Sequence, residues 1–116
     1  MNAIIQSLDS AFESGDAEHL ASLYKSNGRE NAVRGSRRIA KRYARHFERS
    51  SNRSVNYEIL TYNFSDASKL ELKGTMVSSY VENATGKERR TAATVYFVMV
   101  PVAEHYKIQL FEWRKF

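Results

Sequence analysis

The spacing of the apolar residues changes once along the sequence, near Arg53, and this change limits the folds that the chain can adopt. Before Arg53 the apolar residues recur every three or four positions, which is typical of one face of a helix. After Arg53 they alternate with polar residues and are rich in β-branched and aromatic types, which is typical of strands. This order predicts an α+β domain in which helices cover one face of a curved, mainly antiparallel sheet.

Three helices are predicted before Arg53, and turn residues separate the first two. Apolar residues between positions 4 and 12 share one helical face, and Gly15 is expected to end this helix. Asp16 is placed to cap a second helix that runs from residue 17 to residue 24 or 25. The Ser-Asn-Gly cluster at 26–28 predicts a turn after it.

The third helix is expected to start at Ser36 as its cap and to run to about Arg49. At about 100° per residue, Ile39, Tyr43 and Phe47 fall on one arc and the basic residues fall on the opposite arc. The aromatic arc is therefore expected to pack and the basic arc to face solvent. The predicted basic surface consists of Arg38, Lys41, Arg42, Arg45 and Arg49.

The positive charge of the chain is concentrated around this helix. Residues 28–53 hold nine of the 18 basic residues and two of the 13 acidic ones, so the remainder holds nine basic and eleven acidic residues. A local excess of this kind favours one anionic partner, such as an acidic protein or an anionic polymer. A nucleic acid is the less favoured partner, because no aromatic residues for base stacking interrupt the basic arc.

Four strands are predicted after Arg53, at 55–64, 69–82, 88–100 and 105–116, with turns at 65–68, 83–86 and 101–104 between them. A change of phase at Ile59–Leu60 indicates a bulge, and Gly74 indicates a bend. On the last strand, Tyr106, Ile108 and Leu110 are expected on one side and Phe111 and Trp113 on the other.

The third predicted strand is apolar on both faces. Its centre reads TVYFVMV at 94–100, with Val95, Phe97 and Met99 on one face and Tyr96, Val98 and Val100 on the other. One helical layer can cover only one face. The second apolar face predicts a homodimer formed through the outer side of the sheet.

Length and composition restrict the remaining possibilities. A chain of 116 residues with 42% apolar residues is expected to form one domain, 1–116, with one core. The absence of cysteine excludes disulfides and thiolate nucleophiles. The N-terminal residues match neither a signal peptide nor a membrane span. The compartment stays open: cytoplasmic for the chain as given, or periplasmic for a domain excised from an envelope protein.

Three stretches carry a family resemblance: AFESGDAEHLASLY at 11–24, GSRRIAKRYARHF at 35–47 and YKIQLFEWR at 106–114. Together they resemble the nuclear transport factor 2-like superfamily, which includes the SnoaL-like domains, and are most similar to its non-enzymatic bacterial members in cell-envelope proteins. The residues that match recurring family features are Gly15, Asp16, Leu23, Tyr24, Gly35, Ile39, Tyr43 and Phe47. The resemblance implies a cone-shaped fold, with three N-terminal helices on a curved four-stranded sheet and a pocket between them.

Enzymes of this superfamily are expected to use a buried carboxylate or histidine as general base. Here Asp16 is better explained as a helix cap, and His46 as a residue at the edge of the third helix's apolar face. Three further carboxylates are expected at the surface: Glu58, Glu71 and Glu112, the last beside Arg114. The sequence thus predicts no catalytic residue, and its scattered histidines, His19, His46 and His105, predict no metal site and no cofactor.

Five aromatic residues are predicted to line the pocket: Tyr24, Tyr43, Phe47, Tyr57 and Trp113. Their rings and hydroxyl groups suit a small amphipathic ligand, although the same rings could simply fill the core.

Three functions remain open. The favoured one is a non-catalytic module for interaction, dimerisation or small-ligand binding, as an accessory domain of a larger bacterial envelope protein. The alternatives are a small-molecule enzyme of the SnoaL or ketosteroid isomerase kind, and an anion or nucleic-acid binder that uses the basic third helix.

Overall fold

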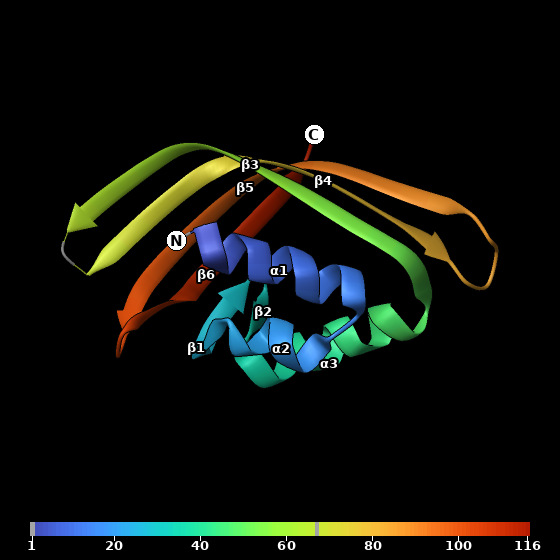
Figure 1. Ribbon diagram of the computed structural model, residues 1–116, viewed down its shortest axis with the longest axis horizontal. Helices are drawn as coiled ribbons and strands as arrows, with labels where there is room; N and C mark the ends of the chain where they lie inside the picture. The colour runs from blue at the N-terminus through green and yellow to red at the C-terminus, as the bar shows by residue number, and fades with distance from the viewer. Residues whose placement is uncertain (1, 67) are drawn as a thin grey trace.

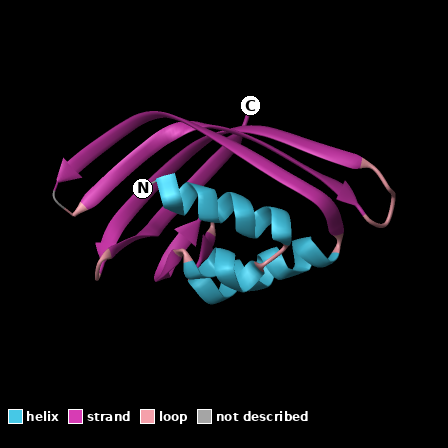
Figure 2. Cartoon of the chain, viewed as in Figure 1, coloured by secondary structure: helices cyan, strands magenta, loops and turns pink. Residues whose placement is uncertain are grey.

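A computed structural model describes residues 2–66 and 68–116 as three helices that lie against the concave side of one curved six-stranded sheet (Figures 1 and 2). The long strands bend over the helices, and all the helices lie on the same side. The elements in chain order are α1 (Asn2–Ser14), α2 (Ala17–Ser22), β1 (Tyr24–Glu30), β2 (Val33–Arg34), α3 (Ser36–Glu48), β3 (Ser50–Asp66), β4 (Lys69–Glu82), β5 (Glu88–Val102) and β6 (His105–Lys115).

The strand order across the sheet is β2-β1-β6-β5-β4-β3. All neighbours are antiparallel except β1 and β6, which run parallel. The α+β class is confirmed, but the prediction of four strands is wrong, because β1 and β2 extend the sheet beyond β6. The turn predicted at 26–28 lies inside β1, whose buried positions after Tyr24 are Gly28 and Glu30 rather than apolar side chains.

The predicted junction of the first two helices is confirmed at Gly15 and Asp16. Gly15 adopts a left-handed φ of 74°, and the Asp16 carboxylate accepts a hydrogen bond from the His19 backbone N–H at 3.0 Å. The predicted end of α2 at residue 24 or 25 is wrong. The Leu23 carbonyl accepts a hydrogen bond from the Ile108 N–H of β6 at 2.8 Å, so Tyr24 already belongs to the sheet.

The orientation of α3 agrees with the predicted arcs. Ile39 is 1% exposed, whereas Arg38 and Lys41 are exposed. The cap differs from the prediction, since Gly35 precedes the first helical turn with a φ of 96° and Ser36 is the first helical residue. The Gly35 carbonyl accepts the Ile39 N–H at 3.1 Å.

The curvature of the sheet starts at the predicted bulge and bend. The pairing of β3 with β4 shifts between Ile59 and Thr61, which leaves Leu60 outside the register. Gly74 lies opposite Ile59, where an added Cβ would overlap the backbone carbonyl of Glu58. Only glycine allows β3 and β4 to approach this closely. In the turn predicted at 65–68, residue 67 lies outside the described residues.

A second bulge in β6 overturns the predicted sides of that strand. Ile108 pairs with Met99, whereas Leu110 pairs with Val98, so one residue of β6 is left over between them. Ile108 therefore lies on the inner face with Phe111 and is fully buried, while Leu110 lies on the outer face and is half-buried.

Arg53 joins the ends of two helices to the start of β3. Its guanidinium donates hydrogen bonds to the carbonyls of Phe12 at 3.0 Å, Phe47 at 3.3 Å and Ser50 at 2.7 Å. It also lies over the Phe47 ring, 4.9 Å from the centroid. A cation at helix C-termini satisfies carbonyls that lack partners within the helix. Arg53 is thus a structural residue, although it belongs to the basic segment of the sequence.

None of the described helices is long and apolar enough to cross a lipid bilayer.

Helix α1 carries two neighbouring carboxyl groups, Asp9 and Glu13, and the charge of one affects the pKa of the other. Asp9 is half-buried, and its Oδ1 atom has no hydrogen-bond partner among the described residues. Glu13 follows one turn later. Burial, and secondly the charge of Glu13, raise the pKa of Asp9 to about 6.

We expect Asp9→Asn to stabilise the protein near neutral pH and to lose this advantage in acid. Because the pKa of Asp9 is raised in the fold, its ionised form opposes folding above pH about 6, and this cost disappears as the pH falls toward about 4. Thermal unfolding between those values should show the gain in Tm shrinking. Glu58→Gln, at an exposed position, is the control, and a gain that is constant with pH would contradict the prediction.

Candidate functional site

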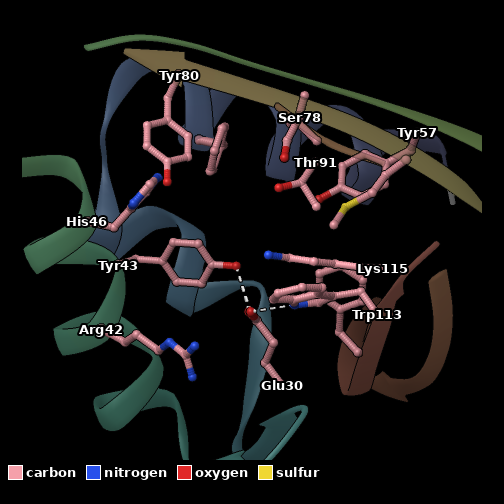
Figure 3. Close-up of a pocket in the computed structure, with 14 residues that line it drawn as sticks. Glu30, Arg42, Tyr43, His46, Tyr57, Ser78, Tyr80, Thr91, Trp113 and Lys115 are labelled. Atoms are coloured by element: carbon pink, nitrogen blue, oxygen red, sulfur yellow. Dashed lines mark hydrogen bonds between the residues drawn. The ribbon is translucent and has the colours of Figure 1, made fainter. Parts of the chain in front are cut away.

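A cavity of about 290 Å³ lies between the helices and the concave sheet (Figure 3). Its apolar wall comes from Phe12, Val55, Met76, Phe111 and Trp113, which α1 and three strands supply. The polar groups that line it are Glu30, Arg42, Tyr43, His46, Tyr57, Ser78, Tyr80, Thr91 and Lys115. The volume is near the lower limit for small-ligand pockets.

Glu30 lies at one end of this cavity and is 6% exposed. Its Oε1 atom accepts hydrogen bonds from the hydroxyls of Tyr24 at 3.0 Å and Tyr43 at 2.7 Å. Its Oε2 atom accepts from the Tyr43 hydroxyl at 2.9 Å and from the Trp113 indole N–H at 3.1 Å. Three protein donors therefore occupy both carboxylate oxygens.

The turn after β1 fixes the position of these groups. Asn31 adopts a left-handed φ of 49°, and its N–H donates to the Phe111 carbonyl at 2.9 Å. Its side-chain oxygen accepts the backbone N–H of Trp113 at 2.9 Å. Asparagine is favoured at such a position, because its short polar side chain bonds the nearby backbone. Asn31 thereby holds the end of β1 against the residue whose indole reaches Glu30.

The tyrosines around Glu30 remain protonated. Burial, and then the negative charge of Glu30, raise the pKa of Tyr24 and Tyr43 well above the usual value. The pKa of Tyr57 is also raised, mainly by burial. Neutral phenols are hydrogen-bond donors, so Glu30 keeps its protein partners over the whole physiological pH range.

The opposite side of the cavity carries hydroxyl groups and a histidine. Figure 3 shows Ser78 and Thr91 directing their hydroxyls toward the interior. His46 stacks on Phe12 at 5.8 Å and meets Tyr80 edge-on at 4.5 Å between ring centroids. Burial and the nearby Arg53 lower the pKa of His46, which favours its neutral form. The prediction of His46 as a boundary residue agrees with these contacts.

Three of the five predicted pocket aromatics line the cavity, namely Tyr43, Tyr57 and Trp113. Tyr24 is buried behind the wall, where it holds Glu30. Phe47 packs edge-on against Phe12 at 5.7 Å and is not part of the wall.

Glu30 was not predicted as a site residue. It is a polar residue in a polar run, and no apolar alternation marks the strand that carries it. The only local feature that could have indicated a strand ending at Glu30 is the Asn31-Ala32 pair, because asparagine is typical of turns.

The predicted basic residues lie on the exposed arc of α3. Arg42 also lines the cavity. A groove of about 720 Å³ continues outside it, and Arg42, Arg45 and Arg49 form one side of this groove. Arg38 and Lys41 line neither the cavity nor the groove.

The other carboxylates weighed from the sequence lie outside the cavity. Glu58 is exposed, and Glu71 accepts a short hydrogen bond from Tyr96 on the outer face. Glu112 lies 3.8 Å from Arg29, so the expected pair with Arg114 is wrong. In the described part of the chain, no group of three or more acidic or histidine side chains is placed to hold a metal ion.

Comparison with known proteins identifies the fold. No protein-family model matches the sequence, and no curated protein matches it. Among solved structures, a candidate scytalone dehydratase from Novosphingobium aromaticivorans superposes with a TM-score of 0.92 at 11% identity, covering 99% of this chain and 80% of that one. A ketosteroid isomerase-like protein from Erwinia carotovora gives 0.84 at 18% identity, covering 98% and 92%.

A nuclear transport factor 2-like superfamily protein from Salmonella enterica gives a TM-score of 0.79 at 13% identity, covering 97% of this chain and 86% of that one. The chain therefore has the nuclear transport factor 2-like fold that its sequence resembles. The neighbours carry different functional descriptions, so the function has to be argued from the site.

We expect Tyr43→Phe to lower the free energy of unfolding by about 1–3 kcal/mol, because it removes a donor shared by both oxygens of a buried carboxylate. Chemical denaturation measures this loss. Tyr106→Phe is the matched control, since the Tyr106 hydroxyl of β6 has no hydrogen-bond partner among the described residues, and it should change stability by less than about 0.5 kcal/mol. Equal losses in the two variants would contradict the role of Tyr43 in holding Glu30.

Proposed function

We propose that the chain is a non-catalytic module that binds a small amphipathic ligand in the cavity between its helices and sheet. The observation that carries this proposal is the hydrogen bonding of Glu30. Its two oxygens accept hydrogen bonds from three protein donors, and the Tyr43 hydroxyl is shared between both oxygens. A carboxylate offers about four acceptor positions in all. A general base needs a free lone pair directed at the proton it removes, and three donors, one of them shared by both oxygens, take up most of the acceptor positions of Glu30.

The same network makes Tyr43 a fixed acceptor for a ligand. Its only hydroxyl proton points to Glu30, so the lone pairs of its oxygen remain for a donor inside the cavity. The surrounding wall is mainly apolar, and Ser78 and Thr91 provide further hydroxyls. This arrangement suits a compact apolar ring or chain that ends in a hydroxyl or amine.

An enzyme of the ketosteroid isomerase kind is the alternative, and the burial of Glu30 in the cavity is the observation in its favour. Such an enzyme would need Glu30 to exchange a protein donor for a substrate proton. At least one of the donors from β1, α3 and β6 would then have to move, which favours binding over proton transfer.

Binding can be tested with para-hydroxyphenylpropanol and with phenylpropanol, which lacks the phenolic donor. Trp113 is the only tryptophan and lines the cavity, so its indole N–H resonance reports binding. We expect the hydroxylated probe to bind about tenfold more tightly, which corresponds to one hydrogen bond, and Tyr43→Phe to remove the difference. If neither probe shifts the resonance at millimolar concentration, or if the hydroxyl makes no difference, the proposal fails.

We further propose that two copies associate through the outer face of the sheet. Val95, Phe97 and Met99 are buried under the helices, whereas Val98 and Val100 lie half-buried on the face that no described helix covers (Figure 1). Leu60 is 61% exposed beside an outer groove of about 800 Å³. A second copy would remove these groups from water.

Sedimentation at roughly 100 µM should show a dimer, since interfaces of standard size hold at that concentration. Val98→Glu introduces a charge at the centre of the outer face and should give a monomer. Ala84→Lys, in the exposed hairpin turn, should leave the dimer unchanged. Wild-type protein that sediments as a monomer would overturn the dimer proposal.

A further inference from the structure

The cavity and the arginine groove adjoin one another. Arg42, His46 and Tyr80 line both spaces, and the edge-on contact between His46 and Tyr80 lies where the two meet. Beyond this pair the groove runs along the last turns of α3 to the hairpin of β4 and β5, with Asn83 and Ala84 on its far side. A ligand in the cavity that reaches past this ring pair would meet the groove.

The groove carries positive charge that the protein does not neutralise. Arg42, Arg45 and Arg49 lie three and four residues apart, so they project from one side of α3. None of the three forms an ion pair with any carboxylate whose side chain the structure describes. Of the two acidic residues that line the groove, Glu82 is held by Arg89 at 3.2 Å, and Glu48 is exposed. Unpaired arginines on one side of a groove are suited to binding carboxylate, sulfonate or phosphate groups.

The walls of the cavity also carry positively charged side chains. Arg42 from α3 and Lys115 from β6 bring cationic groups to its walls on the side where Tyr43 and Glu30 lie (Figure 3). A ligand with a donor at one end and a negative charge at the other would match the Tyr43 oxygen in the cavity and the arginines of the groove. A cationic ligand would meet Arg42, Arg45 and Arg49 on its way in.

We infer that the ligand of this cavity is a small amphipathic anion, whose negatively charged group binds Arg42, Arg45 and Arg49 in the groove while its apolar body and a donor group enter the cavity. This inference rests on the proposed function and adds the chemical class of the ligand. It gives the arginines of α3 a defined partner in place of a general anionic polymer.

The test compares para-hydroxyphenylpropionate with para-hydroxyphenylpropanol, which differ only in the charged group. We expect the anion to bind about tenfold more tightly at low salt, followed at the Trp113 indole N–H, and to lose most of this preference at roughly 0.5 M salt. The double variant Arg45→Gln/Arg49→Gln should abolish the preference. It should leave binding of the alcohol unchanged, because neither residue lines the cavity.

The matched control is Arg37→Gln/Arg38→Gln, which removes the same charge from exposed positions of α3 outside the groove. It should retain the preference for the anion. Equal affinity of the wild-type protein for both probes would overturn the inference and leave the proposed function standing. Equal loss of preference in both double variants would also overturn it, because attraction would then come from the net charge of α3 and a polyanion would be the better partner. Failure of both probes to bind would overturn the proposed function itself.

Discussion

The buried carboxylate of Glu30 is the interaction on which the arrangement of helices and sheet depends. A carboxylate without partners in this position would cost several kcal/mol, so the fold is favourable only when donors surround it. The donors come from three elements, β1, α3 and β6, and the last of these is far from Glu30 in the sequence. Satisfying one polar group therefore fixes the helical layer against the edge of the sheet. It also leaves a polar end in a cavity whose other walls are mainly apolar.

Arg53 also joins the helices to the sheet, because its side chain satisfies polar groups from both. Its guanidinium satisfies carbonyls at the C-terminal ends of α1 and α3 and at the start of β3. Gly15 leaves the space that this side chain occupies, because a Cβ there would collide with the guanidinium. The basic segment thus contains two kinds of cation. Arg53 is committed to the fold, whereas Arg45 and Arg49 remain available to a partner.

The elements with a clear hydrophobic period could be predicted from the sequence, and those held by polar contacts could not. The arcs of α3, the cap at Asp16 and the bulge beside Leu60 follow from spacing and turn chemistry alone. Strand β1 could not be recognised, because Gly28 and Glu30 take the buried positions that apolar residues usually occupy. The bulge in β6 was hidden for a related reason: Ile108 and Leu110 are both apolar, so the pattern does not change when the strand switches faces. The candidate site was predicted only in its aromatic part, since Glu30 becomes a site residue through side-chain contacts between three elements that no periodic pattern announces.

This division explains why the fold and the function require different arguments. The fold depends on where apolar surface and backbone groups are buried, and proteins at 11–18% identity achieve this with other side chains. The function depends on which lone pairs and charges remain unoccupied once the chain has folded. In Glu30 three protein donors take up most of the acceptor positions, in Tyr43 the acceptor positions of the hydroxyl oxygen remain, and in the groove the positive charges of α3 remain. In the proposed binding role, an acceptor inside and cations outside would favour a ligand that carries a donor group at one end and a negative charge at the other.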